Sequence, residues 1–215
     1  MWLSEENQAA IKERFAEMQN PVVLQFVGSS LDCPQCSDVE QLLDEVCNLS
    51  PLLTLEKLNR YVDEEAVKSL KVDKVPAISI TDESRTDYGI RFYGTPGGYE
   101  FSTLLADILM MSSGESGLSQ STRDSLKGLQ KPMDLSVFVT PTCPYCPAAV
   151  HLAHQFAFES PLITGNMVEA TEFPDWANQF DVYGVPKTVM NQSGSLSIEG
   201  AVPEQTLLER VLAAV

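Results

Sequence analysis

Basic residues are scarce in this chain of 215 residues. Lys and Arg together number 14 against 30 Asp and Glu, so the formal net charge is −16 at pH 7. A strongly negative chain repels polyanions, which argues against nucleic acids and anionic membrane surfaces as partners. The excess of acidic side chains is explained by solubility.

Long apolar runs are also missing. No stretch of about 18 apolar residues occurs, so the sequence predicts no membrane-spanning helix. Residues 1–15 lack the basic start, apolar core and cleavage site of a secretory signal. The 5 cysteines are an odd number. Together these features predict a reducing, cytoplasmic compartment, where Cys-x-x-Cys motifs more often serve metal binding or redox chemistry than structural cross-linking.

Two such motifs are present, and they belong to a duplication. Cys33–Cys36 reads CPQC and Cys143–Cys146 reads CPYC, with an offset of 143 − 33 = 110 residues. Val75-Pro76 and Val185-Pro186 share that offset, since 185 − 75 = 110. Landmarks that recur in one order at one spacing indicate two tandem copies of a single fold.

The sequence around these landmarks repeats as well. VVLQFVGSSLDCPQC from Val22 and LSVFVTPTCPYC from Leu135 each place an apolar run and a short turn before the cysteines. After the Val-Pro pairs, RFYGTPGGYEF from Arg91 resembles SIEGAVPEQTL from Ser197. Each copy is therefore expected to end in a similar hairpin and helix.

Each copy alternates strands and helices before that hairpin. This order predicts an α/β fold in which each copy has a mixed central sheet flanked by helices. The two domains are expected over residues 1–115 and 116–215, joined by a Ser- and Gly-rich linker within 111–119. The expected helices span 4–19, 33–48, 63–70, 99–111, 119–130, 144–158, 172–181 and 204–214, and the expected strands span 21–28, 52–58, 77–81, 90–94, 134–140, 161–169, 187–191 and 195–199.

The first cysteine of each pair is placed where a thiolate is stabilised. The thiolate is the attacking species, and the amides and dipole at a helix N-terminus favour it. Each pair follows a strand and a turn and opens a predicted helix, whose first turn suits Pro34 and Pro144. Cys33 and Cys143 are therefore expected to be exposed attacking thiols.

The second cysteine of each pair lies one helical turn later and can reach back to the first. Cys36 and Cys146 are thus expected to be the more buried thiols, which resolve a mixed disulfide with a client protein. Because electrons would pass through cysteine sulfurs, no bound cofactor is expected.

A strand, a Cys-Pro-x-Cys at a helix start and a Val-Pro before a hairpin together resemble the thioredoxin and glutaredoxin fold. Two such units in tandem resemble the glutaredoxin-like protein disulfide oxidoreductases, and PTCPYCP from Pro141 is similar to that family's C-terminal motif. The resemblance implies two tandem thioredoxin-like domains with cis Val75-Pro76 and Val185-Pro186 bonds beside the sulfur pairs, where the neighbouring backbone can pair with a client strand. It also implies protein disulfides or dithiols as substrates and an upstream flavoprotein resembling thioredoxin reductase.

The chain departs from these families at two places. Thioredoxins carry a buried, proton-handling Asp six residues before the first cysteine, where this chain has Val27 and Val137. Glutaredoxins bind glutathione partly through a late Gly-Gly and acidic segment, and IEGAVPEQ from Ile198 lacks it. The two valines argue against thioredoxin-type proton transfer. The missing Gly-Gly and acidic segment argues against glutathione as a substrate.

The two sites are expected to differ. Asp32 and Asp38 lie close to Cys33 in the sequence, and negative charge raises the pKa of a thiol. Cys143 has only neutral close neighbours, so we predict that its pKa is the lower one and that CPYC is the dominant client site. Tyr145 must project near Cys143, where it either contacts clients or is an ordinary exposed aromatic residue.

Several simpler interpretations compete with redox chemistry. A shared zinc or iron–sulfur site is disfavoured because 143 − 36 − 1 = 106 residues separate the pairs, whereas zinc pairs usually lie about 15–20 residues apart. His151 and His154 have a helical spacing but no third ligand nearby, so an ordinary helix face is expected, and no metal site. Cys47 is expected to be a buried apolar residue.

Two other functions remain alternatives to a general oxidoreductase. One is a dedicated electron-relay module that serves a peroxiredoxin system, and the other is a non-catalytic interaction protein. Intact cysteine pairs in both copies favour the oxidoreductase, because a relay of this type usually keeps only one pair.

Overall fold

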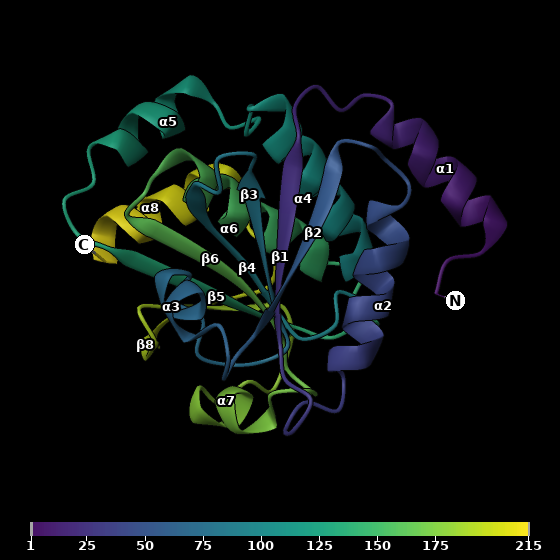
Figure 1. The fold of residues 1–215 in the computed structure, drawn as a ribbon. Coiled ribbons are helices and arrows are strands. Elements are labelled where there is room, and N and C mark those ends of the chain that lie inside the picture. The colour runs from purple at the N-terminus through teal and green to yellow at the C-terminus, as the bar shows by residue number, and fades with distance from the viewer. Residues whose placement is uncertain (1, 215) are drawn as a thin grey trace. The chain divides into compact units, whose positions relative to one another are not determined.

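The computed structural model describes residues 2–214, and within them the elements alternate as the sequence predicts (Figure 1). The helices are α1 (Glu5–Phe15), α2 (Cys36–Cys47), α3 (Glu64–Ser69), α4 (Glu100–Ser113), α5 (Gln120–Lys127), α6 (Cys146–Glu159), α7 (Pro174–Gln179) and α8 (Glu204–Ala214). The strands are β1 (Val22–Gly28), β2 (Leu53–Asn59), β3 (Ala77–Asp82), β4 (Asp87–Tyr93), β5 (Met133–Val139), β6 (Ile163–Glu169), β7 (Lys187–Met190) and β8 (Ser193–Glu199).

The chain forms two compact units, and each unit comprises several separate segments of the chain. The first unit comprises the chain up to Asp87 together with Tyr93–Thr95 and Ile108–Glu115. The second unit comprises Tyr88–Phe92, Pro96–Asp107 and the chain from Ser116 onward. Part of β4 and most of α4 therefore pack with the second half of the chain.

Strand β1 is the centre of the sheet in the first unit. It pairs in parallel with β2, where Val22 faces Leu53, and antiparallel with β3, where Val22 faces Asp82. All of β1 is buried, as its near-continuous apolar sequence predicts for a strand covered on both faces. Helix α2, which follows the first cysteine pair, packs against β1 and β2.

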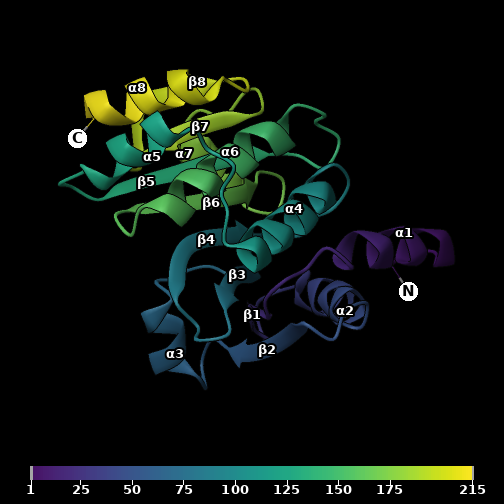
Figure 2. The same ribbon diagram turned by 90° about the horizontal axis from the view of Figure 1, so that it is seen from above.

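Strand β5 has the same position in the second unit. It pairs in parallel with β6, where Met133 faces Ile163, and antiparallel with β7, where Leu135 faces Met190. Strand β8 continues the sheet beside β7, and α6 packs on β5 and β6 (Figure 2). Each unit thus holds a mixed sheet flanked by helices, and each cysteine pair follows the central strand.

The two central strands match with an offset of 133 − 22 = 111, one more than the cysteine offset. Both carry a buried polar residue at the matching position, Gln25 in β1 and Ser136 in β5. The turn before Cys33 is therefore one residue longer than the turn before Cys143.

Helix α4 is longer than the sequence predicts, and the expected linker is correspondingly shorter. The helix continues through Ser113, because Met110 and Met111 are buried and the Ser112 hydroxyl accepts the backbone N–H of Gln19 at 2.9 Å. Among residues 2–214, no helix combines the length and the apolar character needed to cross a membrane.

Candidate redox sites

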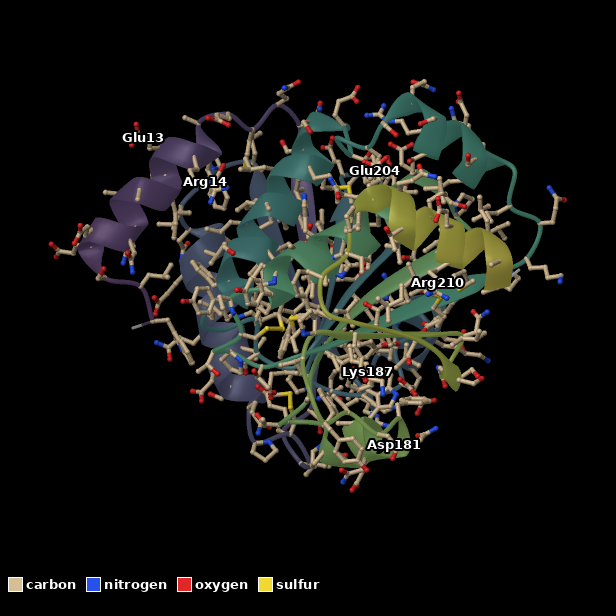
Figure 3. All side chains as sticks on the ribbon, turned by 180° about the vertical axis from the view of Figure 1, so that it is seen from behind. Glu13, Arg14, Asp181, Lys187, Glu204 and Arg210 are labelled. Carbon is tan, nitrogen blue, oxygen red and sulfur yellow. A yellow bond between two sulfur atoms is a disulfide. The ribbon has the colours of Figure 1, made fainter. Side chains whose placement is uncertain are left out.

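A disulfide closes within each cysteine pair. The Cα atoms lie 5.4 Å apart in Cys33–Cys36 and 5.5 Å apart in Cys143–Cys146, inside the usual range for a disulfide. The sulfurs appear in yellow in Figure 3. Within residues 2–214, no group of three or more His, Cys, Asp or Glu side chains has the arrangement of a metal site.

The helices begin at the second cysteine of each pair, three residues later than the position of the first. Helix α2 starts at Cys36 and α6 at Cys146, while Cys33 and Cys143 lie in the turn that precedes them. The expected starts, at residues 33 and 144, are therefore three and two residues too early.

The prolines between the cysteines lie before the helices. Pro34 and Pro144 belong to the turn, where the N–H of Cys36 donates to the carbonyl of Cys33 at 3.3 Å. They are not in the first helical turn, which corrects the expectation from the sequence. In α6 that place is taken by Pro147.

The second cysteine is the more buried one in both pairs. Cys33 is half-buried and Cys36 is 6% exposed, whereas Cys143 is 7% exposed and Cys146 is completely buried. The order of burial is the predicted one. The expectation of an exposed Cys143 is wrong for the disulfide form, in which the sulfur is already covered.

Both Val-Pro peptide bonds, Val75-Pro76 and Val185-Pro186, are cis, as the family resemblance implies. In each pair the proline is buried and the valine half-buried. The Pro76 carbonyl accepts the N–H of Gly94 at 3.0 Å, and the Pro186 carbonyl accepts that of Gly200 at 2.8 Å. The repeated hairpin after each proline therefore holds it through the same backbone bond.

In the second unit, a buried lysine fixes the loop that leads to the cis proline. Lys187 follows Pro186 and is 7% exposed. Its ammonium donates to the backbone carbonyl of Asp181, at 3.1 Å, and both residues are labelled in Figure 3. This bond ties the end of α7 to the start of β7 and so positions Val185-Pro186.

An anionic side chain accompanies the first pair. The Tyr61 hydroxyl donates to Asp32 at 2.6 Å, and this bond, followed by one from Ser29, holds the pKa of Asp32 below its ordinary value. Asp32 is therefore ionised at neutral pH directly beside Cys33, as the predicted difference between the sites requires.

The first pair also borders a cleft of about 500 Å³. Three charged residues line the cleft, and Lys57 lies 2.9 Å from Glu40. The sulfur of Cys36 also accepts the backbone N–H of Ser29 at 3.3 Å. The lining residues are Phe26, Gly28, Ser29, Ser30, Cys33, Cys36, Ser37, Glu40, Lys57, Leu58, Asn59 and Asp63.

Residues Gly98 and Tyr99 contact the turn that precedes the second cysteine pair. The N–H of Tyr99 donates to the carbonyl of Pro141, two residues before Cys143, at 3.0 Å. Gly98 adopts φ +58°, and an added Cβ would collide with that same carbonyl oxygen. Only glycine fits this approach, because it tolerates the positive φ and lacks the Cβ.

Glu100, which follows Tyr99, is a buried titratable residue that the sequence analysis did not single out. It is 1% exposed. Burial raises its pKa to about 7, against a hydrogen bond from Thr103 at 2.8 Å and with help from the charge of Asp107. A glutamate in the first turn of a helix normally marks an exposed terminus, so only the fold reveals its burial.

His151 and His154 bind a buried carboxylate rather than forming an ordinary helix face. Their Nδ1 atoms each lie 2.6 Å from a different oxygen of Asp107, which is completely buried. Burial works to raise the pKa of Asp107, but the charge of His154 and the hydrogen bonds of both imidazoles lower it below its ordinary value. The expectation of an ordinary helix face is therefore wrong for these histidines.

Two further residues that the sequence analysis singles out are Tyr145 and Cys47. Tyr145 is 71% exposed, which fits either of its two interpretations. Cys47 is half-buried and free, and burial followed by the charge of Asp44 raises its pKa to about 12.

A smaller cleft, of about 300 Å³, lies beside the second cis proline. Its lining residues are Thr140, Ala170, Thr171, Pro174, Ala177, Asn178, Val182, Tyr183, Gly184 and Val185.

Known proteins share this arrangement. The family model of the thioredoxin domain matches residues 133–213. A crystal structure of a protein disulfide oxidoreductase from Aeropyrum pernix K1 matches with a TM-score of 0.92 and 33% identity, covering 98% of this chain and 93% of that one. This chain belongs to the protein disulfide oxidoreductase family. The predicted fold class, two tandem thioredoxin-like domains, is thereby confirmed.

Other relatives of this chain are longer proteins. An alkyl hydroperoxide reductase component of Staphylococcus epidermidis is 30% identical over 150 residues, which cover 70% of this chain and 27% of that protein. An NADH dehydrogenase of Ferdinandcohnia aciditolerans is 25% identical over 166 residues, or 75% of this chain and 30% of that one. The chain thus spans less than a third of either relative. A structure of the corresponding alkylhydroperoxide reductase component of Enterococcus faecalis (V583) shares the fold, with a TM-score of 0.89 and 23% identity over 97% of this chain and 99% of that one.

Proposed function

We propose that this chain is a protein dithiol–disulfide oxidoreductase that exchanges disulfides with other proteins at two sites. One observation carries the proposal: both units combine a Cys-Pro-x-Cys disulfide before a helix with a cis Val-Pro bond. The proposed catalytic residues are Cys33 and Cys36 in one unit and Cys143 and Cys146 in the other. Pro34, Val75, Pro76, Pro144, Tyr145, Val185 and Pro186 are proposed to shape the sites.

In the proposed cycle, electrons are exchanged only between sulfur atoms of the protein and of the client. The thiolate of the first cysteine attacks a client disulfide, which forms a mixed disulfide and releases one client sulfur as a thiolate that takes up a proton. The second cysteine loses its proton and attacks the first, which releases the other client thiol and leaves an intramolecular disulfide. Two electrons pass to the client, so no bound cofactor is needed, and a flavoprotein resembling thioredoxin reductase is the proposed source of new electrons.

The second pair is proposed to meet most clients, and the first pair to have an accessory or relay role. The neutral surroundings of Cys143 and the anionic Asp32 beside Cys33 support this division. We also assign the two repeated copies to residues 1–115 and 116–215, and the protein to the cytoplasm.

Dithiothreitol-driven reduction of insulin tests this proposal with three proteins. They are the parent, a Cys33→Ser/Cys36→Ser variant and a Cys143→Ser/Cys146→Ser variant. Activity should survive the first pair of changes and be lost with the second. If all three proteins are folded but inactive, the chain is not a general oxidoreductase, and a dedicated relay or a non-catalytic interaction protein becomes the better description.

A relay that passes electrons to a peroxiredoxin is the second candidate. The 30% identity to a component of an alkyl hydroperoxide reductase supports it. The test adds the chain to a peroxiredoxin, a flavoprotein reductase, NADH and peroxide, and follows NADH oxidation. A relay would restore turnover there while leaving insulin almost untouched, whereas a general oxidoreductase would reduce insulin as well.

A further inference from the structure

The charged cleft beside Cys36 occurs in the first unit, and its matching positions in the second unit are apolar. The offset of 110 that relates Cys36 to Cys146 relates Glu40 to Val150 and Lys57 to Met167. Val150 and Met167 are both completely buried. The two sites therefore share their sulfur geometry but differ in the side chains behind the second cysteine.

Helix geometry brings Glu40 to the same side of α2 as Cys36. The two residues are four positions apart, and helical side chains tilt toward the N-terminus, so Glu40 leans toward the turn that holds Cys36. Both residues line the cleft. Across it, the ammonium of Lys57 in β2 lies 2.9 Å from Glu40 and 2.8 Å from Asp44, and the hydrogen bonds that it donates to Asp44 and then to Glu40 raise its pKa.

Resolution of a mixed disulfide at the first site requires a group that accepts the proton of Cys36. Cys36 must become a thiolate before it can resolve a mixed disulfide, yet its sulfur is almost buried, and burial opposes ionisation of a thiol. The strand position six residues before Cys33 holds Val27, which cannot accept a proton. The charged groups around the cleft are Glu40 and Asp44 of α2, Lys57 of β2 and Asp63 after β2.

Of the two carboxylates that line the cleft, Asp63 has a structural duty, because its Oδ2 accepts the backbone N–H of Asn59 at 2.7 Å. Glu40 instead faces Lys57. We propose that Glu40, positioned by Lys57, accepts the proton of Cys36 through solvent in the cleft when the first site resolves its mixed disulfide. This inference rests on the proposed function of that site.

Each step of this reaction balances. The Cys36 thiol gives its proton to the Glu40 carboxylate, and the resulting thiolate attacks the sulfur of Cys33. A Cys33–Cys36 bond forms, the bond between Cys33 and the client sulfur breaks, and the electron pair leaves with the client sulfur. That thiolate and the Glu40 carboxyl then exchange protons with solvent, which returns Glu40 to its anionic form.

A small aromatic disulfide can separate attack from resolution. In a Cys47→Ala/Cys143→Ser/Cys146→Ser background, the thiols that remain are Cys33 and Cys36. The reduced protein is mixed with one equivalent of 5,5′-dithiobis(2-nitrobenzoate), and absorbance at 412 nm is followed by stopped flow between pH 5.5 and 9. Attack by Cys33 releases one thionitrobenzoate, and resolution by Cys36 releases a second.

In Glu40→Gln, the second release should slow by about 10-fold at pH 7, a modest share of what general base catalysis provides, while the first changes by less than about 2-fold. The slow step should recover as pH rises, and with added formate. Glu40→Asp should restore part of the rate. Glu40→Val/Lys57→Met, which installs the residues of the second site, should also show the slow second release.

Asp38→Asn is the matched control, because Asp38 is an exposed acid on the same helix and does not line the cleft. It should leave the second release unchanged, because any effect of its charge on Cys33 falls on the first release. The inference is overturned if Glu40→Gln keeps the parent's second release at every pH. If the parent itself releases only one equivalent, the first site is not a working dithiol pair, and its part in the proposed function fails together with this inference.

Discussion

Asp107 and His154 form a contact in which neither side chain is exposed, with 2.6 Å between Oδ2 and Nδ1. The other ring nitrogen of His154 lies 3.1 Å from the carbonyl oxygen of Arg91. A carboxylate and a carbonyl oxygen both accept hydrogen bonds, so each ring nitrogen of His154 faces an acceptor. The second unit therefore encloses a polar contact between two completely buried side chains.

Replacing Asp107 should destabilise the second unit strongly. In Asp107→Asn both imidazoles lose the carboxylate that their ring nitrogens face, and a lost hydrogen bond to a charged group costs about 1.5–3 kcal/mol. Urea unfolding at pH 6 measures the loss. His151→Gln is the control, because His151 is 31% exposed and should cost only about 1 kcal/mol. Equal stabilities for Asp107→Asn and the parent would show that the pair contributes nothing.

The protein should be more stable in mild acid than in base. Glu100 keeps its proton up to about pH 7 in the folded chain, against an ordinary pKa of 4.5, so its contribution is complete below pH 4.5 and lost as pH rises through 7. His151 acts in the same direction, because its pKa is raised by Asp107 against burial. Asp107 acts oppositely, since its pKa is lowered, and its contribution is lost only in strong acid.

The size of this effect can be isolated with one variant. The shift of Glu100 makes the unfolding free energy about 2 kcal/mol higher at pH 5.5 than at pH 8. Glu100→Gln should remove most of that difference, as measured by urea unfolding at the two pH values. A variant whose pH dependence equals the parent's would mean that Glu100 ionises normally in the folded chain.

Gly98→Ala should damage the second site more than its positive φ alone explains. Gly98 and Gly114 both have φ > 0, at +58° and +73°, but only at Gly98 would an added Cβ collide with the Pro141 carbonyl. Gly114→Ala should therefore cost about 1 kcal/mol, and Gly98→Ala about 2–3 kcal/mol more. Insulin reduction in the Cys33→Ser/Cys36→Ser background should fall for Gly98→Ala and persist for Gly114→Ala.

The two attacking thiols should titrate at different pH. Cys143 should have a lower pKa than Cys33, because ionised Asp32 lies beside Cys33 and opposes its thiolate. Thiolate absorbance at 240 nm, measured on variants that retain one cysteine pair, gives both values. Asp32→Asn should lower the pKa of Cys33 and leave Cys143 unchanged. A lower pKa at Cys33 than at Cys143 in the parent would reverse the proposed division of labour.

Much of the fold was predictable because its signals are local or repeated. The apolar run of β1 marks a buried strand, and the recurrence of Cys-Pro-x-Cys and Val-Pro in one order marks the duplication. The start of α2 was misjudged, because proline is compatible with both a turn and a first helical turn, and the sequence does not separate them.

The surroundings of the sites were less predictable, since they depend on residues far apart in the chain. His154 and its partner Asp107 are 47 residues apart, and neither residue carries a local sign of the contact. Glu40 and Lys57 look like ordinary surface charges until the fold places them around one cleft. Hydrophobic periodicity indicates which face of a helix is buried, but not which polar group meets it.

The second unit takes in a segment from the first half of the chain, Pro96–Asp107. That segment supplies the Tyr99 bond to Pro141 and the carboxylate that both histidines share. A gene fragment that begins at the linker would encode CPYC without either support. A second unit expressed on its own therefore keeps these contacts only if Pro96–Asp107 is expressed with it.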